Sequence, residues 1–393
     1  MRIILEQFLP VEPELVWPYV SEPDLMNAWS LAPVRAAAPG DGGSADSVGA
    51  MRVVTLRALG REVPLEEVIE RAKPPASLVY RVVGGVPLRH HRGEITLTKE
   101  GSGSHLRWNV EFESPLAGVD RMMKLVLEKQ LRSSLEKLAH VVKEPAPRRS
   151  IATSPFEEPP PSKELWANAA SILEKQRTLA SRLEDAGDPK QWFARVYAFV
   201  TEEQLALCNS GQIAHPAWVL RIIPRFHDYY AMNLQRWLGL ESGVAEAHWR
   251  SAFRAMEQGP RWYADPLMAI SYGLAKGVRA HIEEDLPRAL ADVFVEHYAG
   301  QCSFARFRAD YLLMGNVFRR ASKRMLERMP SRHFPFVARL MAPWVPPEGR
   351  DAVIHRRFYD VPRERRLAFE RGERLAAWLL ERASVPVRAS MTA

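Results

Sequence analysis

Cysteine is scarce in this 393-residue sequence, where only Cys208 and Cys302 are present. Two thiols cannot build the disulfide framework of a small secreted domain, and they cannot supply a four-thiolate zinc site. No stretch approaches the roughly 18 uninterrupted apolar residues of a membrane-spanning helix, and the N-terminal stretch MRIILEQFLPVEPE reaches charge and proline before a signal-peptide core could form. The sequence therefore predicts a cytoplasmic protein that is stabilised by apolar cores.

Positive charge is concentrated in one window. The net charge is +7, yet residues 301–370 alone hold 15 Lys and Arg against 7 Asp and Glu. No nucleic-acid recognition motif accompanies this excess, so we expect no nucleic-acid partner. Segment 318–344 interleaves basic residues with aromatic residues and Met, which is typical of an element lying at an anionic membrane surface. A packed helix with a basic outer face is the alternative interpretation.

The composition changes in the middle of the chain. Between Lys143 and Glu164, proline, serine and charge replace hydrophobic periodicity, which indicates a semi-rigid linker. Strand patterns dominate before this stretch and helical spacing follows it. We therefore expect a domain over 1–142, a linker over 143–163, and a second domain over 164–393.

The first domain combines strands with one long helix. In HLRWNVEFE the apolar residues Leu106, Trp108, Val110 and Phe112 alternate with polar ones, as in a strand with one face in a core. From Val119 onward the apolar period becomes 3.6 residues, which predicts an amphipathic helix. The expected order is a strand, two short helices, about six strands and the long helix, an α+β arrangement.

Four segments of this half resemble a known superfamily. They are VEPELVWPYVSEPDLMNAWS, PGDGGSADSVGAMRVV, PLEEVIERAKPPASLVYRV and HHRGEITLTKEGSGSHLRWNVEF, and together they are similar to the START-like (polyketide cyclase/dehydrase and lipid transport, SRPBCC) proteins. The resemblance implies a helix-grip fold, in which a curved antiparallel sheet grips the C-terminal helix around an apolar cavity. Such a cavity would hold a lipid, a quinone or a polyketide-like molecule. Because the superfamily contains both enzymes and carriers, the fold does not choose between them.

The inward parity of the strands and of the long helix selects candidate ligand-binding residues. These are Tyr80, His91, Trp108, Val110, Phe112 and Met123. His91 is the exception on this face, because it is a titratable imidazole ring among apolar residues. It could orient a ligand or act as an acid or base, or it could be a hydrogen-bonded histidine at a strand end.

The second half shows helical spacing throughout and predicts an all-α bundle. In DPLMAISYGLAKGVRAHIEEDLPRAL, His281 and Asp285 fall in the apolar stripe of the helix. Residues four apart can share one metal ion, or form a base with its orienting carboxylate. The alternatives are a buried His–Asp hydrogen bond that locks two helices, or a bond from Asp285 to the backbone amides exposed before Pro287. Pro287 predicts an interruption of the helix at this point, because it has no N–H to donate.

Further candidate ligands lie on other predicted helices. His227 lies beside the core face of its helix, Asp228 lies nearly opposite, and Asp310 follows in FRADYLLMGNVF. With His281 and Asp285 they could supply mixed nitrogen and oxygen ligands for a divalent zinc, iron or manganese ion. The HExxH zinc motif is missing, so the spacing alone is a weak zinc signature.

The pieces RFHDYYAMN, AHWRSAFRAM and GVRAHIEEDLPRAL resemble a bacterial family of helical proteins of unknown function. That family has an F-x-D segment, matched by Phe226 and Asp228, and an AHIxxDL segment, matched by 280–286. The resemblance implies that Asp228 belongs with the site, although its helical phase separates it from the core face. Two functions lead as hypotheses: binding or transport of a hydrophobic small molecule by the first domain, or a metal-dependent hydrolase or oxygenase-like enzyme around His281 and Asp285. A scaffold for partner proteins, formed by both halves, is a third.

Overall fold

The computed structural model describes residues 1–58, 61–85, 88, 90–113, 119–143, 156–259, 266–329 and 360–384. Their contacts divide the chain into two units. The first comprises Met1–Glu157 together with Gly300–Leu312, and the second comprises Glu158–Ala299 together with Leu313–Ala393. We call them the sheet unit and the helical unit. Residues 144–155 of the predicted linker lie outside the described residues.

The sheet unit is built on a seven-stranded antiparallel sheet in the order β1-β7-β6-β5-β4-β3-β2. The predicted α+β arrangement is confirmed. Its elements are β1 (Arg2–Leu9), α1 (Pro13–Ser21), α2 (Pro23–Met26), β2 (Val34–Ala38), η1 (Asp41–Gly43), β3 (Met51–Ala58), β4 (Arg61–Lys73), β5 (Ser77–Gly84), β6 (His90–Glu100), β7 (Gly103–Glu113) and α3 (Val119–Val141).

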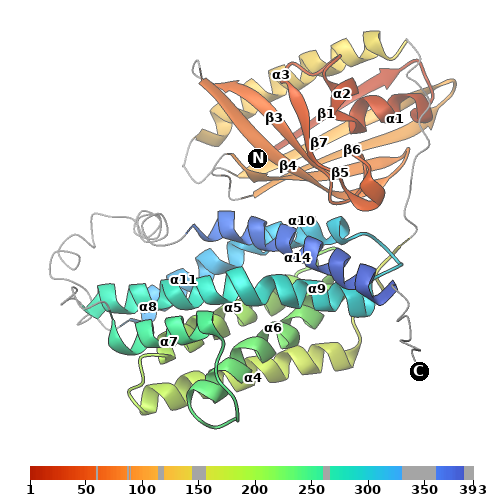
Figure 1. The fold of residues 1–393 in the computed structure, drawn as a ribbon. Coiled ribbons are helices and arrows are strands. Elements are labelled where there is room, and N and C mark those ends of the chain that lie inside the picture. The colour runs from red at the N-terminus through yellow and green to blue at the C-terminus, as the bar shows by residue number, and fades with distance from the viewer. Residues whose placement is uncertain are drawn as a thin grey trace, which may run out of the picture. The chain divides into compact units, whose positions relative to one another are not determined.

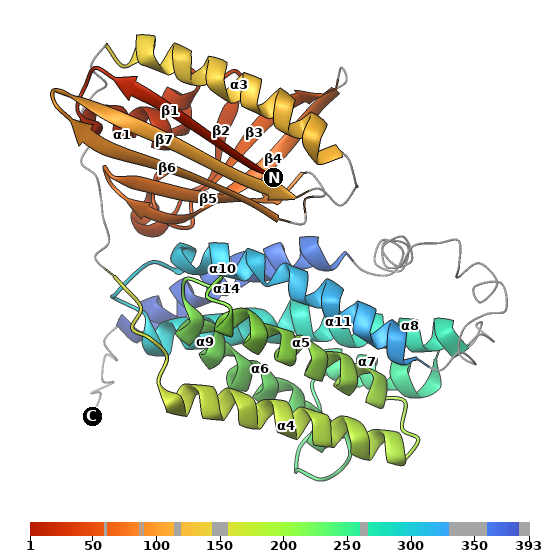
Figure 2. The ribbon, with the colours of Figure 1, turned by 180° about the vertical axis from the view of Figure 1, so that it is seen from behind.

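The core of the sheet unit lies between the sheet and α3, which runs along one face of it (Figures 1 and 2). The alternation along β7 buries Leu106, Trp108, Val110 and Phe112, and their neighbours on β1 and β6 complete the layer. Near its C-terminal end α3 contributes the buried residues Leu135 and Leu138 to the same core. The period-2 pattern of β7 therefore decides which face of the sheet receives the helix.

A segment from far along the sequence completes the sheet unit. It includes η3 (Phe304–Phe307) and the start of α10 (Arg308–Leu313). The buried carboxylate of Asp41 accepts hydrogen bonds from the Ser303 backbone N–H at 2.8 Å and from Arg306 at 2.6 Å. Gly49, at a φ of +83°, lies so close to Ala305 that a Cβ would come within 1.9 Å of its carbonyl oxygen. The glycine-rich turn 39–49 therefore packs against residues 303–308. From the sequence, these later residues were assigned to the second domain.

The helical unit is all-α within the described residues, which confirms the predicted class. Figures 1 and 2 show its helices, with α8, η2 and α9 following one another along one line. The elements are α4 (Lys163–Asp185), α5 (Gln191–Asn209), α6 (Pro216–Trp237), α7 (Ala247–Gln258), α8 (Pro266–Ala280), η2 (His281–Asp285), α9 (Leu286–His297), α11 (Gly315–Arg328) and α14 (Val361–Ser384).

The interruption predicted by Pro287 is a π-helical turn. The turn η2 spans His281–Asp285, and the Leu286 N–H donates to the His281 carbonyl five residues earlier. Pro287 has no N–H for the carbonyl of Glu283, so the regular ladder cannot continue there. Single π-helical turns within helices are frequent at functional sites. This turn carries both His281 and Asp285.

None of the described helices is long and apolar enough to cross a membrane.

Candidate functional site

Asp285 is the centre of a buried hydrogen-bond network in the helical unit. Its side chain has no exposed surface. One carboxylate oxygen lies 2.8 Å from Nδ1 of His281 and accepts the indole N–H of Trp249 at 2.9 Å. The other lies 3.2 Å from Nε2 of His248. The i, i+4 pair predicted from the sequence therefore exists, and α7 adds two partners to it.

These contacts determine the charge of the pair. Burial by itself would raise the pKa of Asp285, but the hydrogen bonds from His248, His281 and Trp249 outweigh it and hold the pKa below its usual value. Burial lowers the pKa of His281 in spite of the neighbouring carboxylate. At neutral pH Asp285 is a carboxylate and His281 is neutral. His281 Nδ1–H then donates to Asp285, which leaves Nε2 with a free lone pair.

Asp285 also belongs to a cluster of side chains that could bind a metal ion. Among the residues that the structure describes, Glu246, His248 and Asp285 form a group whose ligand atoms all lie within 4.8 Å of one another. Nε2 of His248 is 3.4 Å from Glu246 and 3.2 Å from Asp285. Arg288 also contacts Glu246, at 2.8 Å. Two carboxylates and one imidazole are a donor set that suits zinc, iron or manganese.

Aromatic rings enclose the other side of His281. Its ring is stacked on Phe226, with centroids 3.5 Å apart and an interplanar angle of 8°, and Tyr197 meets it edge-on at 4.7 Å. Nε2 of His281 is buried and has no hydrogen-bond partner in the structure. Both carboxylate oxygens of Asp285 therefore have hydrogen-bond partners, whereas Nε2 of His281 has none.

The structure joins two of the five ligand residues predicted from the sequence, and the other three have different surroundings. His227 is buried near Tyr197, with ring centroids 6.1 Å apart. Asp228 is exposed, as its helical phase indicates. Asp310 is buried but belongs to the sheet unit. His281 and Asp285 are in direct contact.

Three residues of the network were missed by sequence reasoning. Glu246, His248 and Trp249 lie at the start of α7, more than thirty residues before Asp285. The last two belong to the piece AHWRSAFRAM, which helped to carry the resemblance to the helical family. That likeness was the one signal that could have selected them, since no spacing rule links two separate helices.

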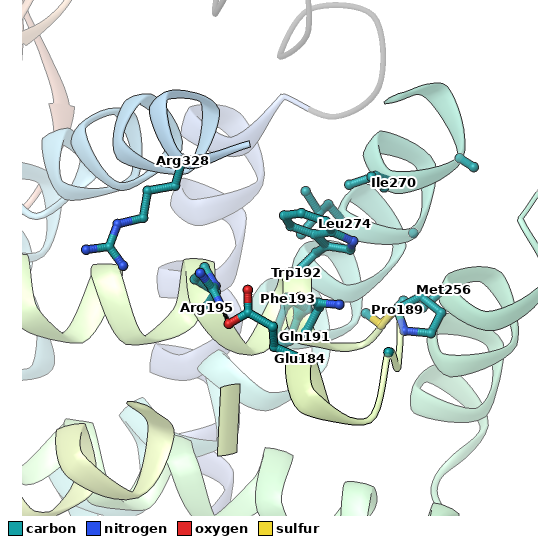
Figure 3. Close-up of a pocket in the computed structure, with 13 residues that line it drawn as sticks. Glu184, Pro189, Gln191, Trp192, Phe193, Arg195, Met256, Ile270, Leu274 and Arg328 are labelled. Atoms are coloured by element: carbon teal, nitrogen blue, oxygen red, sulfur yellow. Dashed lines mark hydrogen bonds and ion pairs between the residues drawn. The ribbon is translucent and has the colours of Figure 1, made fainter. Parts of the chain in front are cut away.

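A pocket of about 500 Å³ opens beside this network (Figure 3). Its apolar lining includes Trp192, Phe193 and Leu274, and an ion pair between Arg195 and Glu184 lies in its wall. The Phe193 ring reaches from the pocket to His281, with centroids 5.9 Å apart. One aromatic ring therefore separates the pocket from the buried histidine.

The sheet unit has polar groups of its own on the inner face of the sheet. The Trp108 indole N–H donates to the Tyr80 hydroxyl at 2.9 Å. The Arg52 guanidinium lies 4.7 Å from the centre of the Tyr80 ring and forms a buried ion pair with Glu67 at 2.7 Å. Burial raises the pKa of Tyr80 well above its usual value, so Tyr80 is a neutral phenol whose own O–H remains available to donate.

The other predicted ligand-binding residues belong to the core cluster that contains Tyr80 and Trp108, or lie next to it. Val110 and Phe112 are buried in the core, and Met123 is partly buried against it. Nδ1 of His91 accepts the Val82 backbone N–H at 3.2 Å, and burial lowers the pKa of His91 to about 4. His91 therefore has a structural hydrogen bond, and its ring is neutral at physiological pH.

The basic window is described only in part. Residues 330–344 of the predicted membrane element lie outside the described residues. On α11, Arg320 pairs with Glu203 at 2.6 Å, and Arg324 pairs with Glu202 at 3.0 Å. Part of the basic stripe is therefore neutralised by α5, and the membrane surface stays a prediction.

Two family models match the chain. One, described as polyketide cyclase / dehydrase and lipid transport, covers residues 4–143. The other, described as a family of unknown function (DUF5995), covers residues 169–378. Both resemblances seen in the sequence are confirmed. No curated protein matches the chain.

Several solved structures are similar to the first part of the chain. The protein TTHA0849 from Thermus thermophilus is 14% identical, with a TM-score of 0.31. A START superfamily protein from Mycobacterium smegmatis is 13% identical, also with a TM-score of 0.31. Protein MLL2253 from Mesorhizobium loti is 18% identical, with a TM-score of 0.29. Each match covers 36% of this chain and 97% of the other.

Proposed function

The chain belongs to the DUF5995 family through residues 169–378 and carries an N-terminal polyketide cyclase/dehydrase and lipid transport domain, and we propose that this domain binds a hydrophobic small molecule that has a hydrogen-bond acceptor. A quinone, a polyketide-like molecule or a lipid carbonyl has this chemistry. The family match implies hydrophobic ligand binding in general. The kind of ligand is our inference from the inner face of the sheet.

The observation that supports this proposal is the uneven packing of α3. Towards its C-terminal end Leu135 and Leu138 are fully buried, whereas Met123, Leu127 and Leu131 on the preceding turns are only partly buried against the same core. An apolar stripe that faces a core without being covered by it can exchange its remaining contact with water for contact with a ligand. The N-terminal half of α3 is therefore the side on which we expect the ligand.

The acceptor requirement comes from Tyr80. Its hydroxyl oxygen already accepts from Trp108, so the remaining function of this group is to donate its proton. A neutral phenol in an apolar layer favours a carbonyl or hydroxyl oxygen as its partner. A pure hydrocarbon would leave this O–H without an acceptor.

The experiment is to extract natively purified protein and identify bound hydrophobic molecules by mass spectrometry, followed by titration with a fluorescent quinone analogue. Leu127→Trp should place a larger side chain on the partly buried stripe of α3, where we expect the ligand, and abolish binding. Leu125→Trp is the matched control, because Leu125 is on the same helix but 72% exposed. If neither extraction nor titration detects a ligand, or if both variants bind equally well, the proposal fails.

A second candidate function is a metal-dependent enzyme in the helical unit. The convergence of Glu246, His248 and Asp285 favours it, with His281 as the residue that orients Asp285 from behind. Elemental analysis of the wild type, His248→Ala and, as a surface control, His297→Ala tests the idea. About one metal ion per chain in the wild type and in His297→Ala, with loss in His248→Ala, would support it. Absence of metal from all three would remove it.

A further inference from the structure

Six polar side chains in the interior of the helical unit have buried atoms without hydrogen-bond partners. We call them the inner polar cluster; they come from α4, α5, α6 and η2 and comprise Gln176, Tyr197, Thr201, His227, Tyr230 and His281. All six are at most 6% exposed. Folded proteins satisfy the great majority of such groups, and six left unsatisfied would cost free energy comparable with the whole stability of a domain.

These side chains are neighbours. Tyr197 is at the centre, with its ring centroid 4.7 Å from that of His281, 5.7 Å from Tyr230 and 6.1 Å from His227. Thr201 lies one turn further along the same face of α5. Gln176 is near enough to the Tyr197 hydroxyl to affect its pKa, yet outside hydrogen-bond geometry.

The chemistry of the cluster points to an uncharged partner. It consists of an amide, a hydroxyl, two phenols and two imidazoles, and none of these carries a fixed charge. Burial lowers the pKa of His227 to about 4 and raises that of both tyrosines, so these groups are neutral at physiological pH. Together they offer donors and acceptors, next to the aromatic faces of Phe193 and Phe226. Burying an ion among them would cost much more than burying a neutral polar molecule.

We propose that the helical unit encloses a binding site for a small uncharged polar molecule, held by the inner polar cluster, in which the contact with Asp285 fixes the His281 ring. The Asp285 contact holds the imidazole through Nδ1, while Nε2 is buried and has no hydrogen-bond partner. The pocket of about 500 Å³ provides the route of entry, because the Phe193 ring lines it and also contacts His281. This proposal is independent of the hydrophobic ligand of the sheet unit.

The test uses the full chain. Purified protein is desalted and heat-denatured, and the released low-molecular-weight fraction is analysed by mass spectrometry, while crystals of the same preparation show what occupies the cluster. We expect one polar organic molecule per chain and density within hydrogen-bond distance of at least three members. Ordered water alone, or a metal ion coordinated by His227 and His281, would overturn the proposal.

Variants keep the test independent of any folding defect. Tyr197→Phe removes one hydroxyl without changing the shape of the side chain, and it should weaken rebinding of the released molecule about tenfold. Tyr229→Phe is the control, since its hydroxyl bonds Asp292 at 2.8 Å outside the cluster. Equal rebinding by the two variants would contradict the assignment. Leu127→Trp should leave this ligand in place while it removes the hydrophobic one, so the two proposals can fail separately.

Discussion

Replacing Asp285 with alanine tests whether this residue is the structural centre of the helical unit. The substitution leaves the Trp249 indole N–H and the His281 Nδ1–H buried without their acceptor, since Trp249 is fully buried and His281 is 5% exposed. Each buried donor left unpaired costs about 1–3 kcal/mol. His248 is partly exposed and can turn to water. We therefore expect the free energy of unfolding of the helical unit to fall by about 3–5 kcal/mol.

A second variant at this position refines the expectation. Asp285→Asn keeps one acceptor oxygen for Trp249 or His281 and loses the charge, so its effect should be about 1–2 kcal/mol. Asp292→Ala is the matched control, because Asp292 lies on the adjoining helix, is partly exposed and accepts one hydrogen bond from Tyr229. Its effect should stay below about 1 kcal/mol.

Thermal unfolding followed by circular dichroism at the helix band measures the series. For a unit of this size, the alanine variant should lower the melting temperature by on the order of 10 °C. Because the chain has two units, the helical transition has to be resolved from that of the sheet unit before free energies are assigned. An Asp285→Ala protein that melts within about 2 °C of the wild type would refute the reasoning, since two donors would then be buried without an acceptor at no cost.

Three further predictions concern the sheet unit. Burial lowers the pKa of His91 from 6.5 to about 4, so the unfolded chain binds the proton more tightly than the folded chain. The free energy of unfolding should therefore fall by about 2–3 kcal/mol as the pH is lowered from 6.5 to 4. His91→Phe should make the melting temperature less dependent on pH in this range. Gly93→Ala would place a Cβ 2.1 Å from the Tyr80 ring, which should destabilise the unit by about 1–3 kcal/mol. The same substitution should weaken binding of the fluorescent quinone analogue. Asp41→Ala removes the carboxylate that Arg306 and the Ser303 N–H share, so amide hydrogen exchange should rise in residues 303–308 and remain unchanged in β6.

The sequence predicts the sheet unit well because its information is local. Strand alternation in β7 identifies the buried face residue by residue, and the change of period after Val119 predicts α3. The polar pair formed by Arg52 and Glu67 was not predicted. From sequence alone, a charged residue within a strand is expected to face solvent. The cross-strand register between β3 and β4 places Arg52 opposite Glu67, and the two form a buried ion pair.

Of the candidate site in the helical unit, the sequence predicted only the contact between two residues that lie one helical turn apart. His281 and Asp285 share a face by their spacing, and the structure joins them. The α7 partners could not be placed, because which helices meet is decided by packing and not by local periodicity. For Asp228, helical phase and family resemblance disagreed, and the exposed side chain follows the phase.

The two faces of the His281–Asp285 pair have different chemistry, and this difference separates the hypotheses for the helical unit. On the Asp285 side the available ligands are Glu246 and His248, which are partly exposed and include a carboxylate, so this side suits a cation. On the His281 side the inner polar cluster consists of uncharged, buried side chains, so this side suits a neutral molecule. Neutralising Asp285 should weaken both kinds of binding, because it would be a direct ligand of the cation on one side and orients the imidazole on the other. His248→Ala should affect the cation alone, and Tyr197→Phe the neutral molecule alone, so the three variants together assign each ligand to its side.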